Sequence, residues 1–237
     1  VYVNNNDLNS GITVQDDSKK AVTIPSDGNY LTNTIVEPII SHMEKMSAAL
    51  NKPATLTPAK PIGSGQVLVI DTTSFGDNDT IYINGDDIRE YLSGSDKLKI
   101  KKKDDQTIVF NFKNTDDLTI GQFLCTVEGQ VINSSSPVSS EDPKNELVDK
   151  VAQRIVWNCV NCSKVTVSNT TGIFLLPKDN NTFDITGTSS GWIISDGKVV
   201  NSGGEWHGVY RNMTSYDEAT LNALKTIENN TPKASER

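Results

Sequence analysis

Short β-like runs that follow one another at a nearly constant interval are the feature that most constrains the fold of this chain. From residue 155 onward they arrive roughly every 8 to 12 residues, separated by Asn, Asp, Ser and Gly turns. Strands at this spacing, without helices between them, predict either a β-sandwich or a β-solenoid whose coils stack strand on strand. The runs are Ile155–Trp157, Lys164–Val167, Gly172–Leu176, Phe183–Ile185, Gly191–Ile194 and Lys198–Val200.

The first half of the chain continues this strand pattern. Several of its runs alternate apolar and polar residues, which is typical of half-buried strands. A chain of 237 residues is within the size of one all-β domain. We therefore expect a single domain over residues 1–228, and a polar linker toward a missing stalk over residues 229–237. The runs are residues 12–14, 21–24, 66–70, 80–83, 98–100 and 107–112.

Three segments have a helical period instead. Apolar residues spaced by three and four predict a long helix from about Gly28 to Leu50, with one face packed against a sheet. Pro38 lies inside this segment and predicts a kink or a helix restart. Short helices are predicted over residues 146–154 and, after a capping box, near the C-terminus. The apolar stripe of the long helix is Leu31, Ile35, Ile39, Met43, Met46 and Leu50, and that of the C-terminal helix is Leu221, Leu224 and Ile227.

Charge and hydropathy exclude two classes of partner. The formal net charge of -8 argues against nucleic-acid binding, which draws its affinity from clustered Lys and Arg. The basic run Lys99–Lys103 is followed at once by Asp104 and Asp105, a pattern typical of a solvated strand end. No run approaches the roughly 20 apolar residues of a membrane span. The abrupt start at Val1 favours a signal peptide that has been removed.

An ordered series of motifs resembles the choice-of-anchor A family of bacterial adhesive domains. The series begins with Trp157-Asn158, continues through a strand that ends at Pro177 and a strand that begins at Gly191, and closes with Glu205-Trp206-His207. The earlier run 107–112 resembles the family strand that precedes a long insertion and a helix. Near the Cys pair and at Lys178 the chain departs from the small or apolar residues common in the family.

The resemblance implies a fold and a function. The fold is a mainly β, right-handed parallel β-solenoid of the ice-binding-like or adhesive type, with a long α-helix packed alongside. The function is adhesion at the bacterial cell surface, to a host matrix protein or a glycan, by a monomeric domain within a longer chain. Family members resemble secreted, cell-wall-anchored proteins of Gram-positive type, so the resemblance implies an extracellular location and no enzymatic activity.

Glu205 and His207 are the one pair whose spacing suits proton transfer. Two residues apart on a strand, they share a face while Trp206 points to the opposite side. A carboxylate beside an imidazole serves acid–base chemistry or part of a metal site. The alternative is structural, with Trp206 in the core and the flanking pair bonded to neighbouring loops. A carbohydrate-active enzyme and a ligand-free spacer therefore remain alternatives to the adhesive domain.

Three cysteines and several acidic turns complete the candidate chemistry. Cys159 and Cys162 form a C-x-x-C without the second ligand pair of a zinc site. We expect a disulfide, either between these two or from Cys125 to one of them, with buried free thiols as the alternative. The acidic segments 77–79 and 84–87 lack EF-hand spacing, so turns are expected there. No metal or cofactor is predicted.

Overall fold

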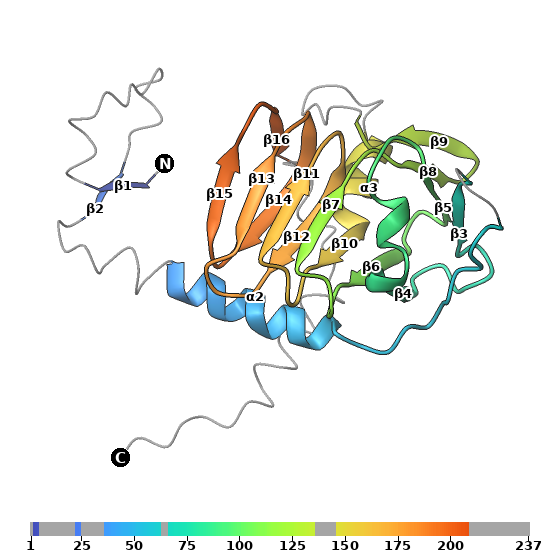
Figure 1. Cartoon of the computed structure of the whole chain (residues 1–237), viewed down its shortest axis with the longest axis horizontal. Helices are drawn as coiled ribbons and strands as arrows, with labels where there is room; N and C mark the ends of the chain where they lie inside the picture. Colours follow the sequence, from blue (N-terminus) through green and yellow to red (C-terminus); the bar gives the residue numbers. More distant parts are fainter. Residues whose placement is uncertain (1, 5–21, 25–35, 63–65, 136–145, 209–237) are drawn as a thin grey trace, which may run out of the picture.

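The structure is a computed structural model that describes residues 2–4, 22–24, 36–62, 66–135 and 146–208. It is mainly β with two α-helices (Figure 1). The predicted strand at residues 12–14, the C-terminal helix and the linker at residues 229–237 lie outside the described residues. At the N-terminus, β1 (Tyr2–Asn4) pairs in parallel with β2 (Val22–Ile24).

Three larger sheets make up the body of the protein. The helix-covered sheet has the strand order β16-β14-β12-β10-β6-β4, the exposed sheet β15-β13-β11-β7, and the hairpin sheet β3-β5-β8-β9. All neighbouring strands in them are parallel except the hairpin pair β8 and β9. This arrangement is consistent with a β-solenoid-like fold and not with two facing antiparallel sheets.

The strand bounds show which predictions are confirmed. Those expected after residue 155 are all present, and so are the four expected between residues 66 and 112. Three strands in residues 117–133 were not predicted. The bounds are β3 (Leu68–Asp71), β4 (Thr80–Asn84), β5 (Leu98–Lys102), β6 (Thr107–Asn111), β7 (Asp117–Ile120), β8 (Leu124–Val127), β9 (Gln130–Asn133), β10 (Ile155–Asn158), β11 (Lys164–Val167), β12 (Thr171–Leu176), β13 (Thr182–Ile185), β14 (Ser189–Ser195), β15 (Lys198–Asn201) and β16 (Trp206–Gly208).

The chain passes from sheet to sheet in a repeating order. Strands β5, β6 and β7 enter the hairpin, helix-covered and exposed sheets in turn. From β10 onward the chain alternates between the helix-covered and exposed sheets, because each further coil omits the hairpin sheet. Val156 pairs with Ile173, and Ile173 pairs with Trp192. Like side chains therefore stack on one another from coil to coil.

Helix α2 (Glu37–Leu50) packs across the outer side of the helix-covered sheet. Met43 is fully buried there, against apolar residues from successive strands. The described helix begins at Glu37 and places Pro38 in its first turn, where a missing N–H is tolerated. The kink or restart predicted at Pro38 involves residues 28–35, which lie outside the described residues. One detail of the predicted apolar stripe is corrected. Ile39 is 51% exposed, and Ile40 makes the contact in its place.

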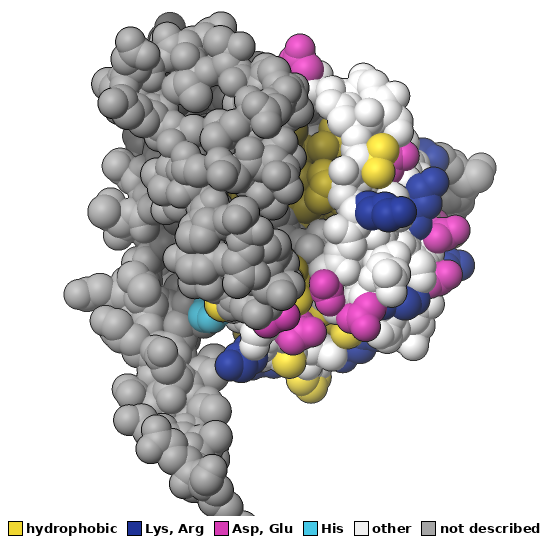
Figure 2. All heavy atoms as spheres, turned by 90° about the vertical axis from the view of Figure 1, so that its left-hand side faces the viewer, with side chains coloured by type: hydrophobic (Ala, Val, Ile, Leu, Met, Phe, Trp, Pro, Cys, Tyr) yellow, Lys and Arg dark blue, Asp and Glu magenta, His cyan; other side chains and the backbone are white. Residues whose placement is uncertain are grey.

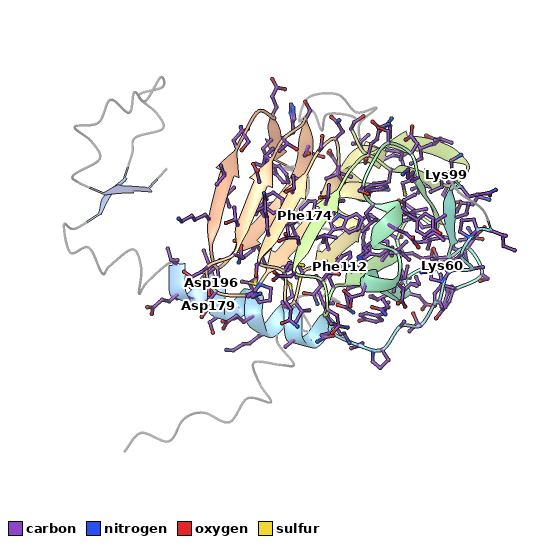
Figure 3. All side chains as sticks on the ribbon, viewed as in Figure 1. Lys60, Lys99, Phe112, Phe174, Asp179 and Asp196 are labelled. Carbon is purple, nitrogen blue, oxygen red and sulfur yellow. The ribbon has the colours of Figure 1, made fainter. Side chains whose placement is uncertain are left out.

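The core between the sheets is organised around Trp157. Its ring stacks on Phe110 at 4.6 Å and lies near Phe112, Phe123 and Phe174. Figure 3 labels Phe112 and Phe174. Helix α3 (Glu146–Arg154) adds Val151 and Ala152 to the same cluster. Two short 3-10 turns, η2 (Gly85–Asp87) and η3 (Arg89–Tyr91), follow β4.

Candidate functional site

The outer side of the exposed sheet is the candidate binding surface. Along β7, β11 and β13, inward side chains such as Leu118, Val165 and Phe183 are buried. The side chains between them point outward and are exposed or half-buried. The outer side of the helix-covered sheet, by contrast, packs against α2. The described helices therefore leave the exposed sheet accessible.

Parallel pairing arranges the outward side chains of this sheet in two rows that cross the strands. Neighbours in a row are spaced by the strand separation, about 4.8 Å. Thr119, Thr166, Asp184 and Val200 share one register and form the first row. Asp117, Lys164, Thr182 and Lys198 form the second row. The rows present hydroxyls and charges of both signs on a backbone fixed by ladder hydrogen bonds.

Asp184 is the least satisfied member of these rows. Its Oδ1 atom is buried and has no hydrogen-bond partner among the described residues. Buried carboxylate oxygens are normally hydrogen-bonded, because desolvation without compensation is costly. The centre of the exposed sheet therefore carries unused acceptor capacity. On the visible described surface, basic and acidic side chains are interspersed (Figure 2).

Hydrogen bonds join the turns that precede β7, β11 and β13, at one edge of this surface. The Lys178 ammonium donates to the Asn161 carbonyl at 3.1 Å and to Asp116 Oδ1 at 3.0 Å. The Ser163 hydroxyl donates to the same carboxylate. Hydrogen bonds from Ser163 and Lys178 lower the pKa of Asp116. Lys178, which departs from the family pattern, thus connects turns of three successive coils.

Asn158 connects the sheet to the helix that covers it. Its Nδ2 donates to the Ser47 carbonyl at 3.0 Å and to Asn111 Oδ1 at 2.7 Å. The Ser47 hydroxyl donates back to Asn158 Oδ1 at 2.6 Å. Asn111 in turn donates to the Leu50 carbonyl at 3.0 Å. The two motif asparagines therefore fix the C-terminal half of α2 on the sheet and lie away from the candidate surface.

The other motif residues lie at the core, a corner and the end of the stack. Trp157 is fully buried and donates from Nε1 to the Thr171 carbonyl at 2.9 Å. Pro177 follows β12 and is half-buried at the corner. Gly191 has φ 116°, and a Cβ there would lie 1.9 Å from the Gly172 carbonyl oxygen. A side chain at Gly191 would thus push the two coils apart.

Glu205 and His207 share a face, as their spacing predicts. His207 Nε2 is 3.5 Å from Glu205 Oε2, and the Glu205 side chain is 75% exposed. Trp206 points the other way, is half-buried, and contacts Phe174 and Phe183 edge-on. Glu205 precedes β16 and His207 lies on it, at the end of the helix-covered sheet and not on the exposed sheet.

The three cysteines are buried free thiols in this structure. Cys159 and Cys162 lie in the turn between β10 and β11, whereas Cys125 lies on β8 in the hairpin sheet. The disulfide expected from the sequence stays a prediction, and among the described residues the structure brings the C-x-x-C pair together within one turn.

The acidic turns form hydrogen bonds within the protein. Asp79 accepts from the Gly76 N–H at 2.7 Å, and Asp77 pairs with Lys103 at 2.8 Å. Asp86 accepts from the N–H groups of Lys113 and Asn114. Within the described ranges, no group of three or more His, Cys, Asp or Glu side chains is arranged to hold a metal ion.

Sequence reasoning missed one of the four strands of the candidate surface. It identified β11, β13 and β15 but not β7, which contributes Asp117 and Thr119. The available signal was the apolar–polar alternation of Asp117-Leu118-Thr119-Ile120. In the part of the chain that the structure describes, no helix is long and apolar enough to cross a membrane.

The protein is a mainly β domain whose parallel sheets are consistent with a β-solenoid-like fold, with a helix along one sheet and an accessible sheet beside it. Residues 1–208 match the family model described as "Putative Ice-binding-like adhesive domain". The chain belongs to this family of adhesive domains, which suggests an adhesive function and an extracellular or surface location. Comparisons with curated proteins and with solved structures found no match.

Proposed function

We propose that this protein is the adhesive domain of a bacterial cell-surface protein and binds a host matrix protein or a glycan through the exposed sheet. The observation that carries the proposal is the accessibility of that sheet. Its outward rows are solvent-accessible on a rigid parallel ladder, whereas the neighbouring sheet is covered by α2. The family match supports adhesion as the kind of activity.

The chemistry of the two rows favours polar recognition. Threonine hydroxyls can donate and accept, and the outward lysines and aspartates offer charges of both signs. Surface attachment through a secretion signal and a cell-wall anchor outside this sequence belongs to the same proposal.

The experiment is an array of glycans and extracellular-matrix proteins probed with the parent domain and two variants. Thr166→Arg places a long charged side chain in the middle of the exposed sheet. Thr126→Arg is the matched control, because Thr126 is also a half-buried outward threonine, but on β8 of the hairpin sheet.

We expect a ligand on the array that binds the parent and Thr126→Arg alike. Thr166→Arg should lose at least about tenfold in affinity, equivalent to about 1.4 kcal/mol. Equal binding by all three proteins would move the site off the exposed sheet. The absence of any ligand across a broad array would favour a spacer module.

A further inference from the structure

The turn that joins β10 to β11 holds two buried thiols that the binding proposal does not use. The Cys159 and Cys162 side chains are both 0% exposed. The Cys162 N–H donates to the Cys159 carbonyl at 3.4 Å, which closes a four-residue turn. Such a turn brings its first and last Cα atoms within about 7 Å. Disulfides span Cα separations of roughly 4.4 to 6.8 Å.

Contacts around the turn hold it between neighbouring coils. The Cys159 N–H donates to the Leu175 carbonyl at 2.9 Å, and the Asn161 N–H donates to the Phe112 carbonyl at 3.4 Å. The Cys159 thiol donates to the Trp157 carbonyl at 3.6 Å. The two sulfur atoms are therefore kept in one small, ordered volume at the corner between the helix-covered and exposed sheets.

Folded thiols in this place are poorly reactive. Burial, and then the adjoining Cys162 thiol, raise the pKa of Cys159. Since the thiolate is the attacking species in disulfide exchange, the folded protein should react slowly. The same cysteines are exposed while the chain is unfolded.

Cys125 occupies a different environment. It lies on β8, and burial raises its pKa to about 12 although the nearby Lys102 ammonium opposes the shift. Its ladder partners are Ile100 on β5 and Ile132 on β9. Nothing comparable to the Cys159–Cys162 turn connects it to another thiol among the described residues.

We propose that Cys159 and Cys162 form a disulfide when the chain folds in the presence of a disulfide oxidant, and that this bond locks the corner beside the exposed sheet. A thiolate of one cysteine attacks the external disulfide, forms a mixed disulfide and releases one thiol. The thiolate of the second cysteine then attacks the protein sulfur of the mixed disulfide and releases the second external thiol. The two cysteines lose two protons and two electrons, and the external disulfide is reduced to two thiols. This inference does not depend on the identity of the adhesive ligand.

The test is oxidative refolding of the full chain. Parent protein is unfolded and reduced, refolded with oxidised glutathione, alkylated while denatured, digested and mapped by mass spectrometry. We expect a peptide linked internally between Cys159 and Cys162, lighter by two hydrogen atoms, with Cys125 alkylated. The bridged protein should unfold about 4 to 7 °C above its reduced form.

Two variants serve as controls. Cys125→Ser should keep the bridge and the rise in Tm, and Cys162→Ser should lose both. Peptide mapping of the parent decides the matter even if Cys162→Ser folds poorly. Alkylation of all three cysteines after oxidative refolding, or a bridge that includes Cys125, would overturn the proposal.

Discussion

Replacement of Trp157 by Ala should remove most of the stability of the domain. Trp157 is fully buried at the centre of the aromatic cluster, with Phe110 stacked on it at 4.6 Å. Truncation of a buried aromatic side chain to alanine costs about 3 to 5 kcal/mol. Loss of the Nε1 hydrogen bond to the Thr171 carbonyl adds about 0.5 to 1.5 kcal/mol. The sum approaches the whole stability of a typical domain, about 5 to 15 kcal/mol.

Two further variants separate the contributions. Trp157→Phe keeps an aromatic ring but loses the hydrogen bond and some volume, and should cost about 1 to 2.5 kcal/mol. Trp206 is only half-buried at the end of the stack, so Trp206→Ala should cost about 1.5 to 3 kcal/mol, roughly half of a full truncation. The order of the three losses follows from burial.

Urea unfolding monitored by far-UV circular dichroism gives the free energy and the m-value of each protein. An m-value equal to that of the parent would show that the same surface unfolds. If Trp157→Ala stays within about 1 kcal/mol of the parent, the aromatic cluster is not the centre of the core and the reasoning fails.

Three other perturbations have defined outcomes. Asn158→Ala should cost about 2 to 4 kcal/mol, because it breaks the buried bonds to Ser47 and Asn111; a loss below about 0.5 kcal/mol in urea unfolding would contradict that role. Burial and the neighbouring Asp179 carboxyl (Figure 3) raise the pKa of Asp196. Folding therefore disfavours the ionised form of Asp196, and the free energy of unfolding increases as pH falls through the raised pKa. Asp196→Asn should therefore raise Tm at neutral pH and leave it unchanged in acid; the same Tm shift at both pH values would refute the assignment. Glu205→Gln should leave ligand binding intact and change stability by less than about 1 kcal/mol, because the Glu205 side chain is 75% exposed and lies 3.5 Å from His207 Nε2; polysaccharide cleavage by the parent that vanishes in this variant would establish an enzyme.

The last coils of the fold could be predicted from the sequence, and its middle could not. Strands β10 to β15 contain apolar runs separated by turn residues, so local pattern and pairing agree. Strands β7, β8 and β9 are four residues each, as are β11, β13 and β15, and all six contain two or three apolar residues, so strand length does not separate the two groups. β7 does alternate polar and apolar residues, but it pairs with β11 across a long insertion, and this distant partner cannot be recognised from the local pattern.

The contacts of helix α2 could also be predicted only in part from the local sequence pattern. The period of α2 predicts a helix with an apolar stripe, but it cannot show where the sheet ends beneath it. Ile39 therefore belongs to the predicted stripe and is exposed, while Ile40 makes the contact. The exposed sheet could not be identified as a site from the sequence either, because its accessibility depends on which sheet α2 covers. The position of α2 in turn depends on the hydrogen bonds between Ser47 and Asn158.

The most direct test of adhesion through the exposed sheet is hydrogen exchange of the domain with and without a ligand identified on the array. Amide exchange reports local opening and protection along the backbone. The account predicts slower exchange in the peptides that contain β7, β11, β13 and β15, with unchanged exchange in the hairpin sheet. Protection confined to the hairpin sheet or to α2, with the exposed sheet unaffected, would contradict it.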